Sequence, residues 1–390
     1  MIKDQDIICL SSQDWNDLWT RKQRFMQRFA KQGNRVMYIE AQASLISLGI
    51  FKRDWRRFFR WLKGPRKIED KLYVATLPLV IPLFQMSRII NEINNWFILK
   101  LLRYWIKKLG LRKPILWTYN PHSESLVGKL GEKLDVYECV DELSASRGLV
   151  KSKVVRTLEK RLIGKVDLVI VTHENLYKSK KAIAKDIYLI PNGGEIEHFK
   201  KASLPGIPLA SEMEKIQRPI IGFLGSIQYW IDLDLIKYIA ISRPRWSIVL
   251  IGPIGRLTKI EKIKGLPNVY LLGRKDYASI PSYIKAWDVC INPYIIDEIA
   301  MNCSPLKLYE YLATGKPVVS VDMPEARKFE GLIQIGIDYK DFLEKIEIIL
   351  DRLPEDSINT ETRIKAVANH SWDYRFWELE QVLKPYLLSI

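Results

Sequence analysis

The chain has 390 residues, 47% of them apolar, and a formal net charge of +16. This length can bury a sizeable core and favours two domains over one. The four cysteines lie far apart and mostly within apolar runs, which argues against a disulfide framework or a zinc site.

The positive charge is concentrated in the first half of the chain. Residues 1–190 hold 36 Lys and Arg against 19 Asp and Glu, whereas residues 191–390 hold 25 against 26. A basic half suits nucleic acid, anionic lipid or an anionic substrate, so the charge alone does not choose among these partners.

The first residues predict a strand rather than a signal peptide, because no positively charged prelude precedes a long apolar stretch. The apolar segment from Leu72 is interrupted by Pro78 and Pro82, and a membrane span needs roughly 20 uninterrupted apolar residues. We therefore expect a cytoplasmic protein that lies on a membrane if it meets one.

Short apolar runs alternate with segments of helical length throughout residues 1–190. The runs are DIICLSS, RVMYIEA, PILWTY, LDVYECVD and VDLVIVT. Apolar runs rich in β-branched and aromatic residues, separated by helical segments, predict parallel strands joined by crossover helices. Residues 1–190 are therefore predicted to form a first Rossmann-like domain.

Two basic, aromatic segments lie within this domain. KRDWRRFFRWLKGPRK (52–67) places aromatic side chains at helical spacing among arginines, so a helix here can dip into the headgroup region of an anionic membrane. The residues expected to contact the membrane are Trp55, Arg56, Phe59 and Arg60. The alternatives are a helix packed on the sheet with a solvated charged face and, less favoured because no known motif accompanies it, binding of single-stranded nucleic acid. For residues 88–108 we favour core packing over membrane contact.

The alternation restarts after IYLIPNGGEIEHF and predicts a second Rossmann-like domain, residues 191–372, with the linker near 191–208. Its apolar runs are PIIGFLGS, WSIVLIGP, NVYLLGR, DVCINPY, KPVVSVD and GLIQIG. Residues 373–390 are amphipathic at helical spacing, and we expect this helix to pack back on the first domain. The fold class is therefore α/β.

The run SPLKLYEYLATGKPVVS (304–320) predicts a helix that binds phosphate at its start. Ser304 and Pro305 suit an N-cap and a first helical position, which would leave the amides of Leu306 and Lys307 free. Lys307 adds a cation where a departing diphosphate accumulates charge, and Glu310 can accept hydrogen bonds from a ribose diol. The alternative is that Lys307 and Glu310 form an ordinary exposed helix pair.

The same run resembles the donor-binding helix of family 4 glycosyltransferases of the GT-B fold, in the teichuronic-acid and exopolysaccharide subgroup. Supporting matches are IPNGGEIEHF, GFLGSIQYWIDLDL, VLIGP, VYLLGRKDYASIPSYIKAWDVCINPY, VYECVDELSASRG and DLVIVTHENLYKSKK. The resemblance covers nearly the whole chain. It implies two Rossmann-like domains that face each other across a cleft.

The resemblance also implies residue roles. Glu310 would hold the donor ribose, Leu306 and Lys307 would contact the diphosphate, Arg274 and Lys275 would flank the base, and Gly225 and Ser226 would approach the phosphates. Together with Ser304 and Pro305, these residues form the expected donor site, and Asn192 and Gly193 would belong to the hinge. Members of this family work without a bound metal, so no metal and no cofactor are expected.

Two positions depart from the family pattern. Asn302 stands where many members have a second glutamate, and Ser226 and Gln228 stand where they often have a basic pair after the first strand of the second domain. We expect Lys307 and a basic residue of the first domain to replace that pair. The alternatives are weak donor binding and loss of activity.

The acceptor side offers three candidates at strand ends. Tyr119 occupies the position at which relatives often carry a histidine, and His122 is displaced from it by three residues. Asp141 can orient or deprotonate an acceptor hydroxyl, or it can cap the following helix. A solvated loop histidine is the alternative for His122, and His173 is expected to cap a helix.

The resemblance thus implies a retaining, metal-independent transfer of sugar from a nucleoside diphosphate sugar. The acceptor would be a lipid-linked or membrane-held glycan at the inner face of the cell membrane, in cell-surface polysaccharide synthesis. Two other classes remain open. One is a nucleotide-sugar epimerase of the same architecture, and the other is a scaffold that has lost activity.

Overall fold

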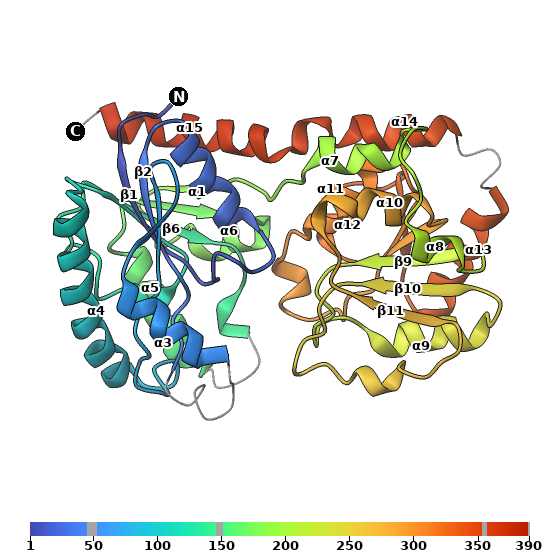
Figure 1. The fold of residues 1–390 in the computed structure, drawn as a ribbon, viewed down its shortest axis with the longest axis horizontal. Coiled ribbons are helices and arrows are strands. Elements are labelled where there is room, and N and C mark those ends of the chain that lie inside the picture. The colour runs from blue at the N-terminus through green and yellow to red at the C-terminus, as the bar shows by residue number, and fades with distance from the viewer. Residues whose placement is uncertain (45–52, 146–150, 353–356, 389–390) are drawn as a thin grey trace. The chain divides into compact units, whose positions relative to one another are not determined.

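The computed structural model describes residues 1–44, 53–145, 151–352 and 357–388, except for the side chains of 53–55 and 357–358. The chain divides into two compact units, which are coloured along the chain in Figure 1. The first unit comprises Met1–Pro191 and Trp372–Ile390, and the second comprises Asn192–Ser371.

The first unit is built on an eight-stranded sheet with the order β3-β4-β2-β1-β5-β6-β7-β8. All neighbouring strands are parallel except β3, which pairs antiparallel with β4 at the edge. The strands are β1 Asp6–Leu10, β2 Arg35–Ile39, β3 Arg66–Glu69, β4 Leu72–Ala75, β5 Ile115–Thr118, β6 Leu134–Cys139, β7 Leu168–Val171 and β8 Ile187–Leu189.

Helices cover both faces of this sheet, which is why β1 is buried along its whole length. The helices are α1 Arg21–Lys31, α3 Arg53–Lys63, α4 Arg88–Leu109, α5 Ser152–Ile163, α6 Glu174–Lys180 and α15 Trp372–Leu388. On one face, Leu102 and Trp105 of α4 pack with Ile8 and Leu116 in one apolar cluster. On the other face, the ring of Phe29 in α1 lies 5.9 Å from that of Trp117.

The C-terminal helix α15 packs on the first unit, as predicted. The ring of Phe376 lies 4.7 Å from that of Phe29 in α1, and the ring of Trp372 lies 5.8 Å from that of Phe25. Each of these four rings is buried. The aromatic face of α15 therefore completes the core between α1 and the sheet.

The second unit contains a six-stranded, wholly parallel sheet with the order β11-β10-β9-β12-β13-β14. Its strands are β9 Ile220–Leu224, β10 Ser247–Ile251, β11 Val269–Gly273, β12 Val289–Asn292, β13 Val318–Val321 and β14 Ile333–Gly336. Its helices are α7 Ile196–Lys200, α8 Ser211–Glu214, α9 Leu233–Ser242, α10 Ile280–Lys285, α11 Leu306–Ala313, α12 Pro324–Arg327, α13 Tyr339–Arg352 and α14 Ser357–Ala366.

Alternate residues of β9 point into two separate cores, so the second sheet is also covered on both faces. Ile220 belongs to the cluster that contains α10 and α11, and Ile221 belongs to the cluster that contains α9 and α13. Gly222 lies directly against the Trp287 ring, and a Cβ there would come within 1.9 Å of it. The two predicted Rossmann-like sheets are thus confirmed. Among the described helices, none combines the length and apolar character that a membrane span requires.

Candidate donor and acceptor sites

The strand order of the second unit determines where a ligand can bind. The chain starts at β9 in the middle of the sheet, adds β10 and β11 on one side, and then adds β12, β13 and β14 on the other. In open α/β sheets, ligands bind beyond the carboxyl ends of the strands at the point where this direction reverses. That point lies between β9 and β12, so the residues that follow these strands, Gly225 and Tyr294, mark the candidate donor site.

The start of α11 is held at this switch point by two contacts. The Asn192 side chain donates a 2.8 Å hydrogen bond to the carbonyl of Ser304, and the Tyr311 hydroxyl accepts a 2.7 Å bond from the amide of Leu224 at the end of β9. The prediction that Ser304 caps the helix is wrong, because Pro305 is the N-cap residue and Leu306 is the first helical residue. The Ser304 hydroxyl instead lies 3.3 Å from the Tyr309 hydroxyl.

Lys307, the second residue of α11, brings a cation to the switch point. Its ammonium donates a 3.0 Å hydrogen bond to the Tyr294 hydroxyl and lies 4.8 Å from the centre of the Phe223 ring. The side chain is buried, and burial lowers the pKa of this ammonium to about 8. Lys307 thus places a cation at the switch point, and its contact with a diphosphate stays a prediction.

Gly225 leaves the space that Lys307 occupies. A Cβ on Gly225 would lie 3.3 Å from the Lys307 Cε, and the glycine has φ of +142°, where other residues are strained. Ser226 follows and accepts a 2.8 Å hydrogen bond from the Gln228 side chain. Glu310 lies one turn after the start of α11, and its Cγ lies 3.4 Å from the position of a Cβ on Gly194.

The two residues predicted to flank the base lie at the end of β11. Arg274 is exposed, whereas the Lys275 ammonium pairs with Glu212 of α8 at 2.7 Å. Asn302, which replaces the family's second glutamate, donates a 2.6 Å hydrogen bond to the Glu298 carbonyl. The roles of these residues toward a donor stay predictions.

The first unit has a switch point of its own between β1 and β5. Tyr119 follows β5, and Asp141 follows the neighbouring strand β6. Burial raises the pKa of the Asp141 carboxyl, and the nearby Lys22 ammonium lowers it. The topology therefore brings two of the three acceptor-side candidates to one edge of the sheet.

Lys22 is a residue of this edge that sequence reasoning missed. It is the second residue of α1, it is 7% exposed, and its ammonium lies 5.4 Å from the centre of the Tyr119 ring. The neighbouring Arg21 guanidinium pairs with the buried Glu138 carboxylate and donates a 2.8 Å bond to the Pro191 carbonyl. The only hint in the sequence was that Lys22 lies in the first turn of the helix that follows the first strand.

His122 is packed into the first unit. Its Nδ1 shares a 2.6 Å hydrogen bond with the Asn120 side chain, and its ring meets the Phe84 ring edge-on at 5.3 Å. Burial lowers the pKa of His122 to about 4, so the ring is neutral at pH 7. These interactions are those of a buried side chain, so His122 is not the solvated loop histidine considered as the alternative. A role of His122 in catalysis stays a prediction. His173 accepts a 3.2 Å bond from the Asn175 amide and caps α6.

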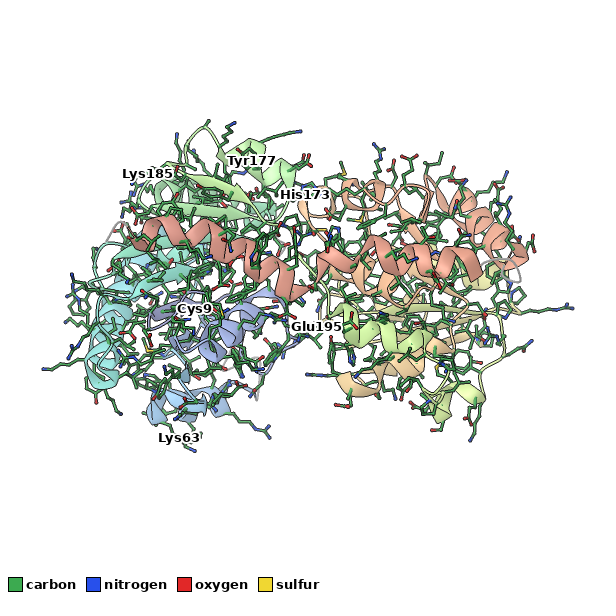
Figure 2. All side chains as sticks on the ribbon, turned by 90° about the horizontal axis from the view of Figure 1, so that it is seen from above. Cys9, Lys63, His173, Tyr177, Lys185 and Glu195 are labelled. Carbon is green, nitrogen blue, oxygen red and sulfur yellow. The ribbon has the colours of Figure 1, made fainter. Side chains whose placement is uncertain are left out.

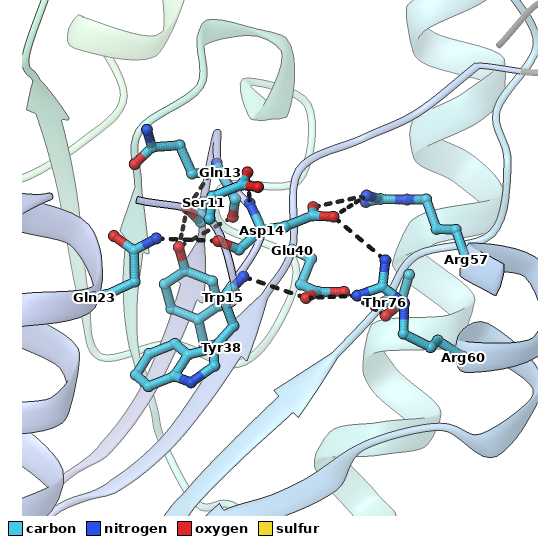
Figure 3. A network of polar contacts seen from close by, with 11 residues as sticks. Ser11, Gln13, Asp14, Trp15, Gln23, Tyr38, Glu40, Arg57, Arg60 and Thr76 are labelled. Carbon is cyan, nitrogen blue, oxygen red and sulfur yellow. Dashed lines mark hydrogen bonds and ion pairs between the residues drawn. The ribbon is translucent and has the colours of Figure 1, made fainter. Parts of the chain in front are cut away.

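Helix α3 turns part of its basic face inward (Figure 3). Arg57 pairs with Asp14 at 2.7 Å, and Arg60 reaches Asp14 at 3.4 Å and Glu40 at 3.2 Å. Phe59, by contrast, is 59% exposed. Two arginines thus anchor the helix on the loop after β1.

The outer face of α3 carries Arg56, Phe59, Leu62 and Lys63, all of them exposed. Figure 2 shows Lys63 at the edge of the first unit. The side chain of Trp55 lies outside the described residues. Within residues 88–108, Leu102 and Trp105 are buried in the core, as favoured, whereas Trp96 is 52% exposed. Membrane contact of this segment stays a prediction.

Comparisons with known proteins agree with this geometry. Residues 218–352 match the family model described as glycosyl transferases group 1. The second unit is thus a group 1 glycosyltransferase domain, and the chain has the GT-B fold. A curated relative of this chain is TuaH of Bacillus subtilis (strain 168), whose name assigns it to teichuronic acid biosynthesis, with 29% identity over 208 residues. The match spans 50% of this chain and 52% of TuaH, so the chain spans about half the length of that relative.

Solved structures match this chain over almost its whole length. A sucrose-phosphate synthase from Thermosynechococcus elongatus superposes with a TM-score of 0.74 at 16% identity, over 99% of this chain and 100% of that one. HepE of Anabaena, solved in complex with UDP and glucose, superposes with a TM-score of 0.64 at 13% identity, over 98% and 99% of the two chains. At these identities the likeness shows the fold. Within the described residues, no group of three His, Cys, Asp or Glu side chains is placed to hold a metal ion.

Proposed function

We propose that this chain transfers a sugar from a nucleoside diphosphate sugar to a hydroxyl group of an acceptor glycan. The observation that carries the proposal is the Lys307 ammonium, which lies beside Gly225 at the switch point of the second sheet and at the start of α11. A buried cation and free helix amides at one place suit a diphosphate.

The chemistry follows from this arrangement. The bond between the anomeric carbon of the donor and the diphosphate oxygen breaks, and the leaving diphosphate keeps the electron pair. The acceptor oxygen forms the new bond to that carbon and passes its proton to an oxygen of the leaving diphosphate. Lys307 and the amides of α11 would stabilise the growing charge on the diphosphate, which is where such groups lower the barrier most. Retention at the anomeric carbon and independence of metal are part of the proposal because the family resemblance implies them.

The acceptor belongs, in this proposal, to a cell-surface polysaccharide assembled at the inner face of the cell membrane. The relationship to TuaH and the basic first half of the chain support this assignment. Within the donor site, Glu310 would bind the ribose diol, and Arg274 and Lys275 would lie beside the base.

The first test is a binding screen of the purified protein with UDP, GDP, ADP and CMP, by calorimetry and thermal shift, with and without chelator. We expect one nucleoside diphosphate to bind, insensitively to chelator, and to bind much more weakly to Glu310→Ala. If none of the four nucleotides binds, the interpretation as a scaffold without activity replaces the interpretation as an enzyme. Conversion of a nucleotide sugar into a second one, without transfer, would identify an epimerase.

The membrane contact is proposed for the outer face of α3, with Arg60 removed from the predicted set because it pairs with Asp14 and Glu40. Phe59 and Leu62 are about 60% exposed, and Arg56 and Lys63 flank them. An exposed apolar pair between cations suits the headgroup region of an anionic bilayer.

Flotation with vesicles of phosphatidylglycerol and phosphatidylcholine tests this contact. The double variant Phe59→Ser, Leu62→Ser is expected to lose most vesicle binding while it keeps nucleotide binding. Ile337→Ser is the matched control, because Ile337 is a 77% exposed apolar residue of the second unit. Equal vesicle binding by the double variant and the control would remove α3 from the proposal.

A further inference from the structure

Lys22 is a buried cation to which no role has been assigned. Its side chain is 7% exposed and lies over the Tyr119 ring, and it makes no hydrogen bond or ion pair with the described residues. A buried ammonium that lacks a hydrogen-bonding partner is costly, so proteins keep one only where something compensates for it. Burial accordingly lowers the pKa of Lys22.

Asp141 is the group that faces Lys22 across this edge of the sheet. The two side chains interact electrostatically, yet they are not joined by an ion pair within 4.0 Å. Asp141 likewise makes no side-chain hydrogen bond with the described residues. A donor and an acceptor of opposite charge are therefore held near each other, and each is left with hydrogen-bonding capacity.

The charges around this pair indicate what can bind there. The groups that act on Lys22 are Asp141, Glu138, Cys9 and Arg21. Arg21 pairs directly with Glu138, whose other oxygen accepts a 2.7 Å bond from the Trp117 ring nitrogen. Burial raises the pKa of the Cys9 thiol, which keeps it neutral. The two cations and two carboxylates cancel, so the site attracts neither an anion nor a cation as a whole.

We propose that Lys22 and Asp141 together bind one hydroxyl group of the sugar acceptor. A hydroxyl oxygen can accept a hydrogen bond from the Lys22 ammonium while its proton is donated to the Asp141 carboxylate, which satisfies both side chains and leaves the local charge at zero. The site lies beyond the carboxyl ends of β1, β5 and β6, at the switch point of the first sheet. The inference rests on the proposed glycosyl transfer and adds a residue, Lys22, and a ligand class to it.

Saturation-transfer NMR tests the binding directly, with the methyl glycosides of glucose, galactose, N-acetylglucosamine and glucuronic acid as probes in the presence of UDP. We expect at least one glycoside to bind the full chain and to lose at least tenfold in affinity in Lys22→Met and in Asp141→Asn. Lys31→Met is the matched control, because Lys31 is an exposed lysine at the end of the same helix. UDP binding, a property of the second unit, should change less than twofold in all three variants.

The stability of the double variant Lys22→Met, Asp141→Asn separates ligand binding from a structural role. Because it removes a buried charge and a half-buried charge that are not paired with each other, it should unfold at the same temperature as the parent chain or higher, while glycoside binding is lost. A lower unfolding temperature together with unchanged glycoside binding would overturn the proposal. Failure of every glycoside to bind the parent chain would overturn it as well, even where UDP binds. Absence of binding of all four nucleotides of the screen would instead refute the proposed function.

Discussion

Each unit places a buried lysine at the start of a helix near the switch point of its sheet, and the two lysines differ in what surrounds them. Lys22 and Lys307 are each the second residue of a helix, each buried, and each near a tyrosine ring, at 5.4 Å and 4.5 Å. Lys307 donates to the Tyr294 hydroxyl, and the Glu310 carboxylate acts on it electrostatically. Lys22 faces Asp141 and the Arg21–Glu138 pair.

The difference teaches that the fold selects the position of a binding residue, whereas the groups around it select its ligand. Lys307 lies at the start of a helix that has no side-chain cap, which suits the diphosphate of a donor. Lys22 makes no hydrogen bond with the described residues and faces Asp141, which suits the hydroxyl of an acceptor. The residues that directly follow β9 and β1 also differ. Gly225, after β9, has no side chain and leaves space for Lys307, whereas the hydroxyl of Ser11, after β1, is hydrogen-bonded to Tyr38.

The largest effect expected from this contrast concerns Lys307→Met. Loss of a buried charge that stabilises the leaving diphosphate should lower kcat on the order of 100-fold and weaken UDP binding at least tenfold. Calorimetry and the initial rate of nucleotide release measure the two effects. Lys340→Met, at an 80% exposed lysine of the same unit, is the control and should change neither. Equal UDP affinity in Lys307→Met and the parent chain would end the donor-side assignment.

A second effect concerns the ribose. Glu310→Gln should weaken UDP binding about tenfold, because a charged acceptor of two hydroxyl groups is replaced by a neutral amide. It should also reduce the preference for UDP over 2′-deoxy-UDP, which is measured by competition in the same assay. A variant that keeps the full preference for the ribonucleotide would show that another group reads the ribose.

A rise in pH should weaken donor binding by about as much as the Glu310→Gln substitution does. Because burial lowers the pKa of Lys307 to about 8, the empty site loses its cation above that pH, and UDP should bind about tenfold more weakly one pH unit higher. The stability of the chain, in contrast, should increase as the pH rises. The unfolded lysine holds its proton up to its ordinary pKa of 10.5, so the free energy of unfolding should rise between about pH 8 and 10.5. Calorimetry and thermal unfolding across this range check both trends, and Lys307→Met should abolish them.

The smallest effect concerns Ser11, the counterpart of Gly225 in the first unit. Its hydroxyl shares a 2.6 Å hydrogen bond with the Tyr38 hydroxyl and accepts a 3.0 Å bond from the Gln13 amide. Ser11→Ala should lower the free energy of unfolding by about 1–2 kcal/mol, as measured by urea denaturation. UDP binding should not change, and a change would mean that the hydroxyl serves a ligand rather than the fold.

The sequence by itself determined the elements and the donor-side helix. Alternation of apolar runs with helical segments predicted all six strands of the second sheet, five of the eight strands of the first, and the helix after Ser371, because these periodicities depend on residues that are neighbours in the chain. The short strands β3, β4 and β8 were missed. The run around Lys307 and Glu310 was found for the same reason, since a helix start and the residues one turn later are separated by only a few positions.

Only the tertiary structure decided which charges meet. Arg57 and Arg60 have the spacing of a membrane-facing helix, yet Asp14 and Glu40, which are distant in sequence, draw them inward and leave Phe59 exposed. Lys22 looked like any lysine in a basic helix until the sheet brought it beside Asp141. Local spacing encodes an element, but burial and long-range packing determine which side chains are left with hydrogen-bonding capacity for a ligand.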